Sequence, residues 1–115
     1  MDVNQFLQQL LEELSQLSFV KNLDLNTEVF VIKGRVFLEN NFFLQVYFNA
    51  QTETTAFALI KEDKRAWGID FDYTRGWHLH PVENPDDHLI IETKTIKEII
   101  TLLAKVWDVI TGKKS

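Results

Sequence analysis

Apolar residues recur at helical spacing near the start of the chain. Intervals of three and four residues between them form one continuous stripe, as on one face of an amphipathic helix. The stripe consists of Val3, Phe6, Leu7, Leu10, Leu14 and Leu17. Asp2, with Gln5 three residues later, has the form of a capping box. The segment DVNQFLQQLLEELSQL therefore predicts a helix over residues 2–17, packed through its apolar face.

A second helical stripe lies near the end of the chain. Thr95 and Glu98 form a T-x-x-E capping box, and Gly112 is a natural helix stop. The stripe between them consists of Ile96, Ile99, Ile100, Leu103, Val106, Trp107 and Ile110. Lys113 and Lys114 follow, where positive charge suits the end of a helix dipole. The pattern predicts a second amphipathic helix from Ile96 to about Thr111.

Between the helices the apolar period changes to two, which is typical of strands with one buried face. The core positions expected in the first hairpin are Phe30, Ile32, Gly34, Val36, Leu38, Phe42, Leu44, Val46 and Phe48, with a turn at 39–41. A strand over 54–62, a turn at 63–65 and a strand over 66–73 follow. In the last of these Trp67, Ile69, Phe71 and Tyr73 share one side, and residues 19–26 are a candidate edge strand.

The order of these elements predicts one α+β domain over residues 1–115. We expect an N-terminal helix, an antiparallel β-meander of four to six strands, and a C-terminal helix, with both helices packed on one face of the sheet. Apolar residues make up 45% of the chain and charged residues 25%, which is a globular balance. No repeat and no inter-domain linker is evident.

Charge and cysteine content narrow the function classes. With 17 acidic and 12 basic residues the net charge is −5, which argues against a general nucleic-acid coat and leaves only a local basic groove open. The chain has no cysteine, so disulfides, thiolate zinc sites and a cysteine nucleophile are excluded. We expect a cytoplasmic protein without a signal peptide or a membrane span.

Candidate chemistry gathers in DFDYTRGWHLHP, residues 70–81. Asp70 and Asp72 share a strand face, as do His78 and His80, because side chains two apart point the same way. A three-residue loop over 74–76, with Gly76 left-handed, would pair Asp72 with His78 and Asp70 with His80. This register predicts two carboxylates beside two imidazoles on the exposed face of the sheet.

Several chemistries use such a set. Imidazoles beside carboxylates are candidate general acids or bases, which makes His78, His80, Asp70 and Asp72 the candidate catalytic residues. No organic cofactor is indicated, but the same set can hold a divalent metal. Further ligands would then come from Glu83, Asp86, Asp87 and His88. A plainer interpretation is ordinary cross-strand Asp–His pairing, worth about 0.2–1 kcal/mol, and the shortness of the pattern favours it.

Three other side chains are candidate substrate contacts. Arg35 and Arg75 are the cations that we expect to hold a phosphate. Trp77 is a candidate stacking platform for a base, although the pattern favours a hairpin aromatic pair with Tyr73.

The order of these motifs resembles the TumE-type toxins of prokaryotic toxin–antitoxin pairs. In that family a segment of the form G-R-x-x-L-x-[DN]-[GN]-x-F-L-x-V opens the meander. The matching positions are Gly34, Arg35, Leu38, Asn40, Asn41, Phe43, Leu44 and Val46. A Trp-Asp strand then leads into histidines before a proline, and the counterparts are Asp70 or Asp72, His78, His80 and Pro81.

This chain departs from the family in its histidines, because Leu79 separates a pair that the family keeps adjacent. Only His88 stands where the family has a later Pro-His-His run. The resemblance implies a toxin that cleaves or binds RNA through the His/Asp face, with a cognate antitoxin as protein partner.

The rival interpretation is a non-catalytic interaction domain, either a homodimer or a module that docks a partner protein. Apolar residues expected on the outer face of the sheet favour it: Val29, Val31, Phe37, Phe43 and Tyr47. The two interpretations differ in what the histidines do, since an interaction domain would not need them.

Overall fold

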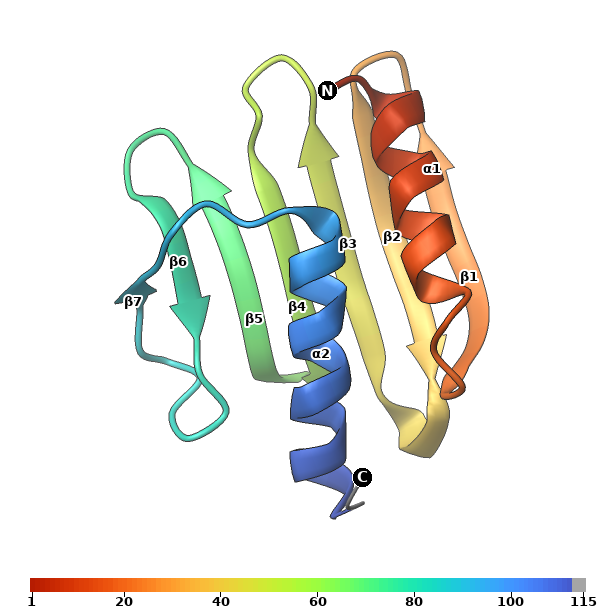
Figure 1. The fold of residues 1–115 in the computed structure, drawn as a ribbon, viewed down its shortest axis with the longest axis vertical. Helices are drawn as coiled ribbons and strands as arrows, with labels where there is room; N and C mark the ends of the chain where they lie inside the picture. Colours follow the sequence, from red (N-terminus) through yellow and green to blue (C-terminus); the bar gives the residue numbers. More distant parts are fainter. Residues whose placement is uncertain (113–115) are drawn as a thin grey trace.

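The computed structural model describes residues 1–112, which form two helices and a seven-stranded antiparallel sheet (Figure 1). Their order is α1 (Val3–Leu14), β1 (Val20–Thr27), β2 (Val31–Leu38), β3 (Phe43–Asn49), β4 (Thr55–Lys61), β5 (Lys64–Asp72), β6 (Gly76–His80), β7 (Leu89–Ile90) and α2 (Ile96–Thr111). Each strand pairs with the next, so the sheet is a simple meander. The α+β fold is confirmed, with the two-residue β7 extending the sheet beyond the four to six strands predicted.

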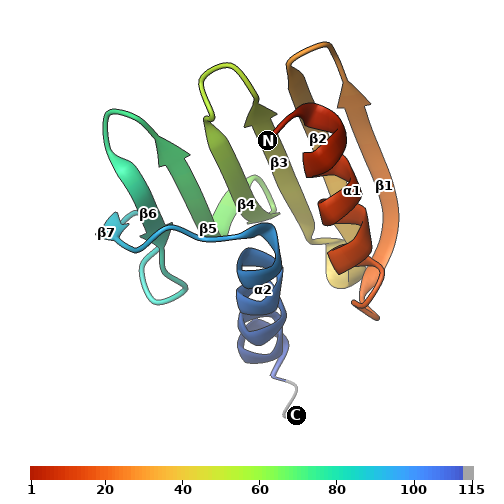
Figure 2. The same ribbon diagram turned by 45° about the horizontal axis from the view of Figure 1, so that its top comes forward.

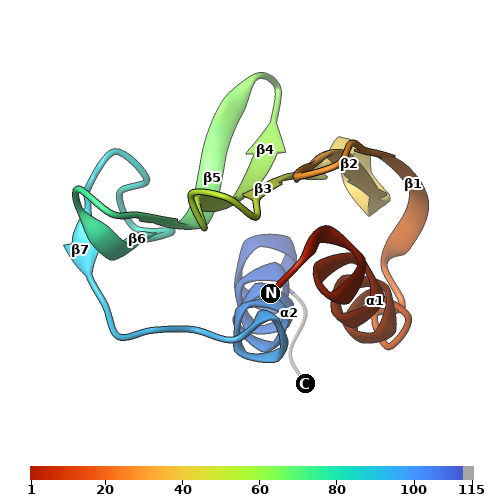
Figure 3. The same cartoon turned by 90° about the horizontal axis from the view of Figure 1, so that it is seen from above.

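Both helices lie on the same face of the sheet (Figure 3). The connection from β7 crosses back to the start of α2 on that side (Figure 2). The opposite face carries no helix, and we call it the free face. Within residues 1–112 no helix combines the length and the apolarity that crossing a membrane requires.

Three of the four predicted helix ends are confirmed, but α1 ends at Leu14 instead of residue 17. The side chain of Asp2 accepts a hydrogen bond from the backbone N–H of Gln5, and that of Thr95 from the N–H of Glu98. Both capping boxes are complete, and hydrogen bonds from Thr95 lower the pKa of Glu98. Gly112 ends α2 in the left-handed conformation, with φ of 72°. The two lysines expected beyond it lie outside the described residues.

The core lies between the helices and the sheet. Phe6 of α1 stacks on Phe48 with ring centroids 4.3 Å apart, and Trp107 of α2 stacks on Phe19 at 4.4 Å. Two predicted core residues fall outside it. Phe30 is 47% exposed because β2 begins only at Val31, and Tyr73 is 71% exposed because β5 ends at Asp72.

The turns between strands follow the backbone conformations that short loops require. The predicted turn at 39–41 is confirmed, with Asn40 and Asn41 at positive φ, 59° and 63°, and the N–H of Phe42 donating to the carbonyl oxygen of Glu39. The β4–β5 turn consists of Glu62 and Asp63 instead of residues 63–65. Both have positive φ, 53° and 63°, as the residues of a tight two-residue hairpin loop do.

Gly34 is required where β2 pairs with β1, opposite Leu25. A Cβ atom there would lie 2.0 Å from the carbonyl oxygen of Asp24, and φ is +156°. We expect Gly34→Ala to push β1 away from β2 and to lower the free energy of unfolding by about 2 kcal/mol or more. Urea denaturation measures this, with Lys33→Ala, an exposed neighbour, expected to stay within about 0.5 kcal/mol of wild type. Equal midpoints for the two variants would contradict the assigned contact.

Candidate functional site: a three-histidine cluster

The β5–β6 hairpin confirms the predicted faces but not the predicted pairs. Asp70 lies opposite His78, and Asp72 opposite Gly76, so the predicted register is wrong by two residues. Side-chain direction is unchanged because a shift of two keeps every residue on its own face. The loop still has three residues, but they are 73–75, because Gly76 already belongs to β6. The side chain of Asp72 accepts the backbone N–H of Arg75 at 2.8 Å and holds the turn in this place.

The two histidines of β6 are buried, whereas the sequence predicted an exposed face. His78 and His80 each expose only 2% of their surface. The segment between β6 and β7, residues 81–88, lies on the side of the sheet away from the helices, and we call it the covering segment (Figure 3). The carbonyl of Pro85 in this segment contacts the ring of His80. A covering loop of this kind leaves no periodic trace in a sequence.

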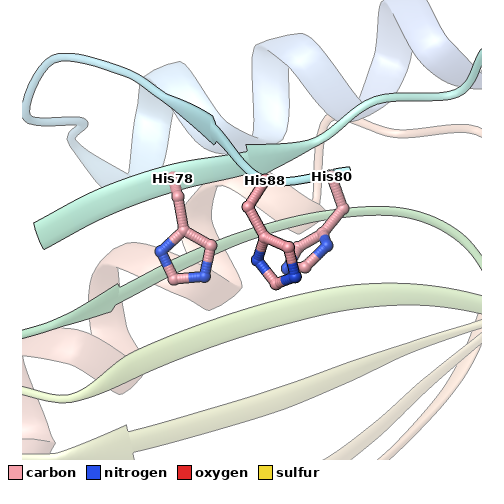
Figure 4. A group of neighbouring side chains, drawn as sticks. All are labelled: His78, His80 and His88. Atoms are coloured by element: carbon pink, nitrogen blue, oxygen red, sulfur yellow. The ribbon is translucent and has the colours of Figure 1, made fainter. Parts of the chain in front are cut away.

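The same segment brings His88 to the other two histidines. The ring centroids of His80 and His88 are 4.5 Å apart, and those of His78 and His88 are 5.5 Å apart. One ring nitrogen from each histidine can be chosen so that all three lie within 4.8 Å of one another. The three side chains point to the same side of β6 (Figure 4). The sequence suggested His88 as a further ligand, and the structure brings it to His78 and His80.

His88 differs from the other two in being exposed. Partial loss of hydration lowers its pKa, and electrostatic interactions with the neighbouring His80, His78, Arg75 and Arg65 lower it further. Its ring is therefore biased toward the neutral form, which can accept a proton or bind a metal.

Hydrogen bonds fix how the two buried rings are oriented. Nδ1 of His80 lies 3.0 Å from the carbonyl oxygen of Pro85, and Nδ1 of His78 lies 3.3 Å from that of Gly76. A carbonyl oxygen only accepts, so each Nδ1 carries the hydrogen and donates it. The other nitrogen of each ring, Nε2, faces the interior of the cluster.

Asp70 occupies that interior. Its Oδ2 atom lies 2.9 Å from Nε2 of His80 and 3.3 Å from Nε2 of His78. The His78 contact is not aligned as a hydrogen bond, which leaves Nε2 of His78 buried without a hydrogen-bond partner among the described residues. Asp70 thus joins both imidazoles through one oxygen atom.

Arg65 is a member of the cluster that the sequence did not suggest. Its Nη1 atom lies 3.0 Å from both ring nitrogens of His80. An atom equidistant from the two lies off both in-plane lone pairs, so we interpret the contact as a guanidinium packed on the ring. Gly68 lies beside it. A Cβ there would make ordinary contact with Arg65 Cδ at 3.6 Å but would lie only 2.9 Å from the carbonyl oxygen of Phe57, so the glycine allows close approach of the β4 backbone. The turn predicted at 63–65 includes Arg65. The observed turn consists of residues 62 and 63, so Arg65 lies on β5.

The remaining candidates lie elsewhere. Asp72 forms an ion pair with Arg75 at 3.1 Å, and hydrogen bonds from Arg75 lower its pKa. Arg35 is on β2, distant in the sheet, with its guanidinium 4.9 Å from the ring centroid of Phe43.

Trp77 belongs to the helix-covered face, where it packs on Phe71 with ring centroids 5.2 Å apart. The predicted pairing of Tyr73 with Trp77 is not observed in the strand register, which places Phe71 opposite Trp77. The hydroxyl of Tyr73 instead donates a hydrogen bond to Glu53, and this bond raises the pKa of Tyr73.

Comparison with protein-family models, with curated proteins and with solved structures finds no match to this chain. The likeness to TumE-type toxins stays a prediction from motifs, and function is inferred from the geometry of the cluster.

Proposed function

We propose that the protein is a toxin-like ribonuclease that cleaves RNA at the cluster of His78, His80, His88, Asp70 and Arg65. The supporting observation is convergence. All three histidines of the chain gather on the free face, where Asp70 contacts His78 and His80 and Arg65 contacts His80. These residues come from β5, β6 and the segment before β7. Buried imidazoles that hold defined hydrogen bonds are typical of a site whose chemistry depends on their position.

RNA cleavage needs the groups that the cluster contains. The 2′-oxygen of a ribose bonds to phosphorus, the bond from phosphorus to the 5′-oxygen breaks, and one proton passes from the first oxygen to the second. Negative charge builds on the phosphate during this step. Imidazole and carboxylate groups move protons, and a guanidinium stabilises phosphate charge.

Two residues of the cluster are exposed to solvent and can be reached by a substrate. His88 and Arg65 are exposed, whereas His78 and His80 lie beneath the covering segment. A backbone phosphate would therefore contact His88 and Arg65 first. The buried pair would act on the substrate through the groups that they orient.

The direct test uses DNA oligonucleotides with one internal ribonucleotide, made with each of the bases at that position. We expect the purified protein to cut on the 3′ side of the ribonucleotide and to leave a 2′,3′-cyclic phosphate. The matched all-deoxy oligonucleotide lacks the nucleophile and should stay intact. Mass spectrometry of the products distinguishes the outcomes, and an uncut ribonucleotide pool would refute the proposal.

A protein-docking role is the second candidate, and the edge of the sheet favours it. In β7, Leu89 is 47% exposed and Ile90 is 89% exposed, beside the cluster. Apolar side chains on an open edge strand suit a protein partner, such as an antitoxin or a second copy. The outer-face residues predicted for such a role are less open: Val31, Phe37, Phe43 and Tyr47 are half-buried, and only Val29 is 82% exposed. Under this candidate the histidine variants would keep partner binding.

A further inference from the structure

The two buried histidines direct the same nitrogen at the same carboxylate. Because both Nδ1 atoms donate to backbone carbonyls, a neutral ring carries its lone pair on Nε2. Each lone pair would then face Oδ2 of Asp70, at 3.3 and 2.9 Å. Two lone pairs and a carboxylate oxygen repel one another, so neutral rings alone do not explain the arrangement.

Protonation does not explain it either. A proton on His80 would account for its aligned contact with Asp70 but would leave Nε2 of His78 without a hydrogen-bond partner. Protonation of both rings would place two imidazolium ions and the nearby guanidinium of Arg65 against a single carboxylate. The two histidine side chains are only 3% and 2% exposed, and unbalanced buried charge of that size is strongly unfavourable.

We propose that His78, His80, His88 and Asp70 bind one divalent transition-metal ion of the Zn²⁺ type. A cation between the lone pairs and the carboxylate turns their repulsion into attraction. In a tetrahedral site with metal–ligand bonds of about 2.0 Å, neighbouring donor atoms lie about 3.3 Å apart. The separation between Asp70 Oδ2 and Nε2 of His78 is 3.3 Å, which equals this value, and that to Nε2 of His80 is shorter, at 2.9 Å. The nitrogens of the three histidines lie within 4.8 Å of one another, so the rings would have to close on the ion.

The surroundings of the donors also suit a metal. Metal-binding histidines almost always donate their second ring N–H to a carbonyl or carboxylate, as His78 and His80 do to Gly76 and Pro85. Three imidazoles and one carboxylate favour Zn²⁺, Co²⁺ or Ni²⁺ over Mg²⁺ and Ca²⁺, which prefer oxygen donors. His88 would close the site from the covering segment and tie that segment to β6.

A catalytic role for the metal rests on the proposed function. The proposal that the cluster binds a metal does not. A zinc-type ion polarises a phosphoryl oxygen and can expand to five ligands to accept one. His88, the exposed donor, marks the side from which a phosphate would approach. Metal binding and RNA cleavage are therefore measured separately.

The test is titration of the metal-free protein, without a polyhistidine tag, with Zn²⁺ by calorimetry and with Co²⁺ by visible absorption. We expect one ion per chain and Co²⁺ bands of four-coordinate intensity. Every histidine of the chain is in this site and there is no cysteine, so imidazole-dependent binding reports on it alone. His88→Ala changes an exposed residue and should weaken binding about 100-fold or more, since even losing an outer partner costs about 10–100-fold.

Asn84→Ala is the matched control, because Asn84 is exposed and precedes His88 in the same segment. This variant should bind as wild type does. The proposal is overturned if wild type binds neither ion, if His88→Ala binds equally well, or if the control loses binding too. Metal binding without RNA cleavage would sustain the site and refute the nuclease. Cleavage that persists in a chelator would refute the metal's catalytic role.

Discussion

Replacement of both His78 and His80 by alanine is expected to reduce RNA cleavage by about 100-fold or more. Positioned proton-transfer or metal-holding groups typically contribute at least that factor. The two rings supply the Nε2 atoms that face Asp70, so their loss removes the interior of the cluster. Initial rates on the single-ribonucleotide substrate measure the effect, and growth inhibition in cells should disappear with it.

Two further variants make this result specific. His88→Ala leaves the buried rings in place and should also lose cleavage, so a folding defect cannot explain both losses. Gln45→Ala changes an exposed residue of β3 outside the cluster and should keep the wild-type rate. Circular dichroism establishes that each variant is folded. Cleavage that survives in a folded His78→Ala/His80→Ala protein would remove the cluster from the reaction.

Trp107→Ala is expected to lower the free energy of unfolding by about 3–5 kcal/mol, the range for large aromatic side chains deleted from a core. Trp107 is 1% exposed, stacks on Phe19 and meets Phe42 edge-on with ring centroids 5.2 Å apart. It therefore packs α2 against the residue before β1 and the residue before β3, which lie at the same end of the sheet, and its loss leaves a cavity there. Chemical denaturation monitored by far-UV circular dichroism gives the value.

Trp107→Phe separates the packing of this residue from its polar group. Nε1 of Trp107 is buried without a hydrogen-bond partner among residues 1–112, and phenylalanine removes that N–H while keeping a ring. We expect Trp107→Phe to lose markedly less stability than Trp107→Ala, and Val109→Ala, at an exposed position of the same helix, to change little. If Val109→Ala and Trp107→Ala were equally destabilised, the assigned packing of α2 would be incorrect.

The fold could be predicted because the helices and most of the strands carry local signals in the sequence. The capping boxes at Asp2 and Thr95, the stop at Gly112 and the alternation through β2 and β3 are local signals, and local signals survive in a single sequence. Strand ends were less certain. Phe30 and Tyr73 continue the apolar alternation but fall just outside β2 and β5. A strand ends where its pairing with a neighbouring strand stops, and the alternation of apolar residues can continue beyond that point.

The site could be predicted only in part, because local signals fix the face of a side chain but not its partners in the fold. Alternation fixes which face a side chain takes, so Asp70, His78 and His80 were placed on one face correctly, although the predicted strand pairs, Asp72 with His78 and Asp70 with His80, were wrong. Exact pairing depends on turn geometry, and the hydrogen bond from Arg75 N–H to Asp72 shifted it. The burial of His78 and His80 depends on the segment between β6 and β7, which folds over the sheet. The contact of His80 with Arg65 depends on where the β4–β5 turn ends. Neither feature leaves a periodic signal in the sequence.

The orientation of the buried rings is the claim on which the proposed site depends, and NMR measures it directly. With three histidines in the chain, long-range ¹H–¹⁵N spectra of labelled protein resolve each ring. We predict that in the metal-free protein Nδ1 of both His78 and His80 carries a hydrogen, and that added Zn²⁺ shifts Nε2 of both. Rings with hydrogen on Nε2 and none on Nδ1, or Nε2 signals unmoved by saturating Zn²⁺, would contradict the account.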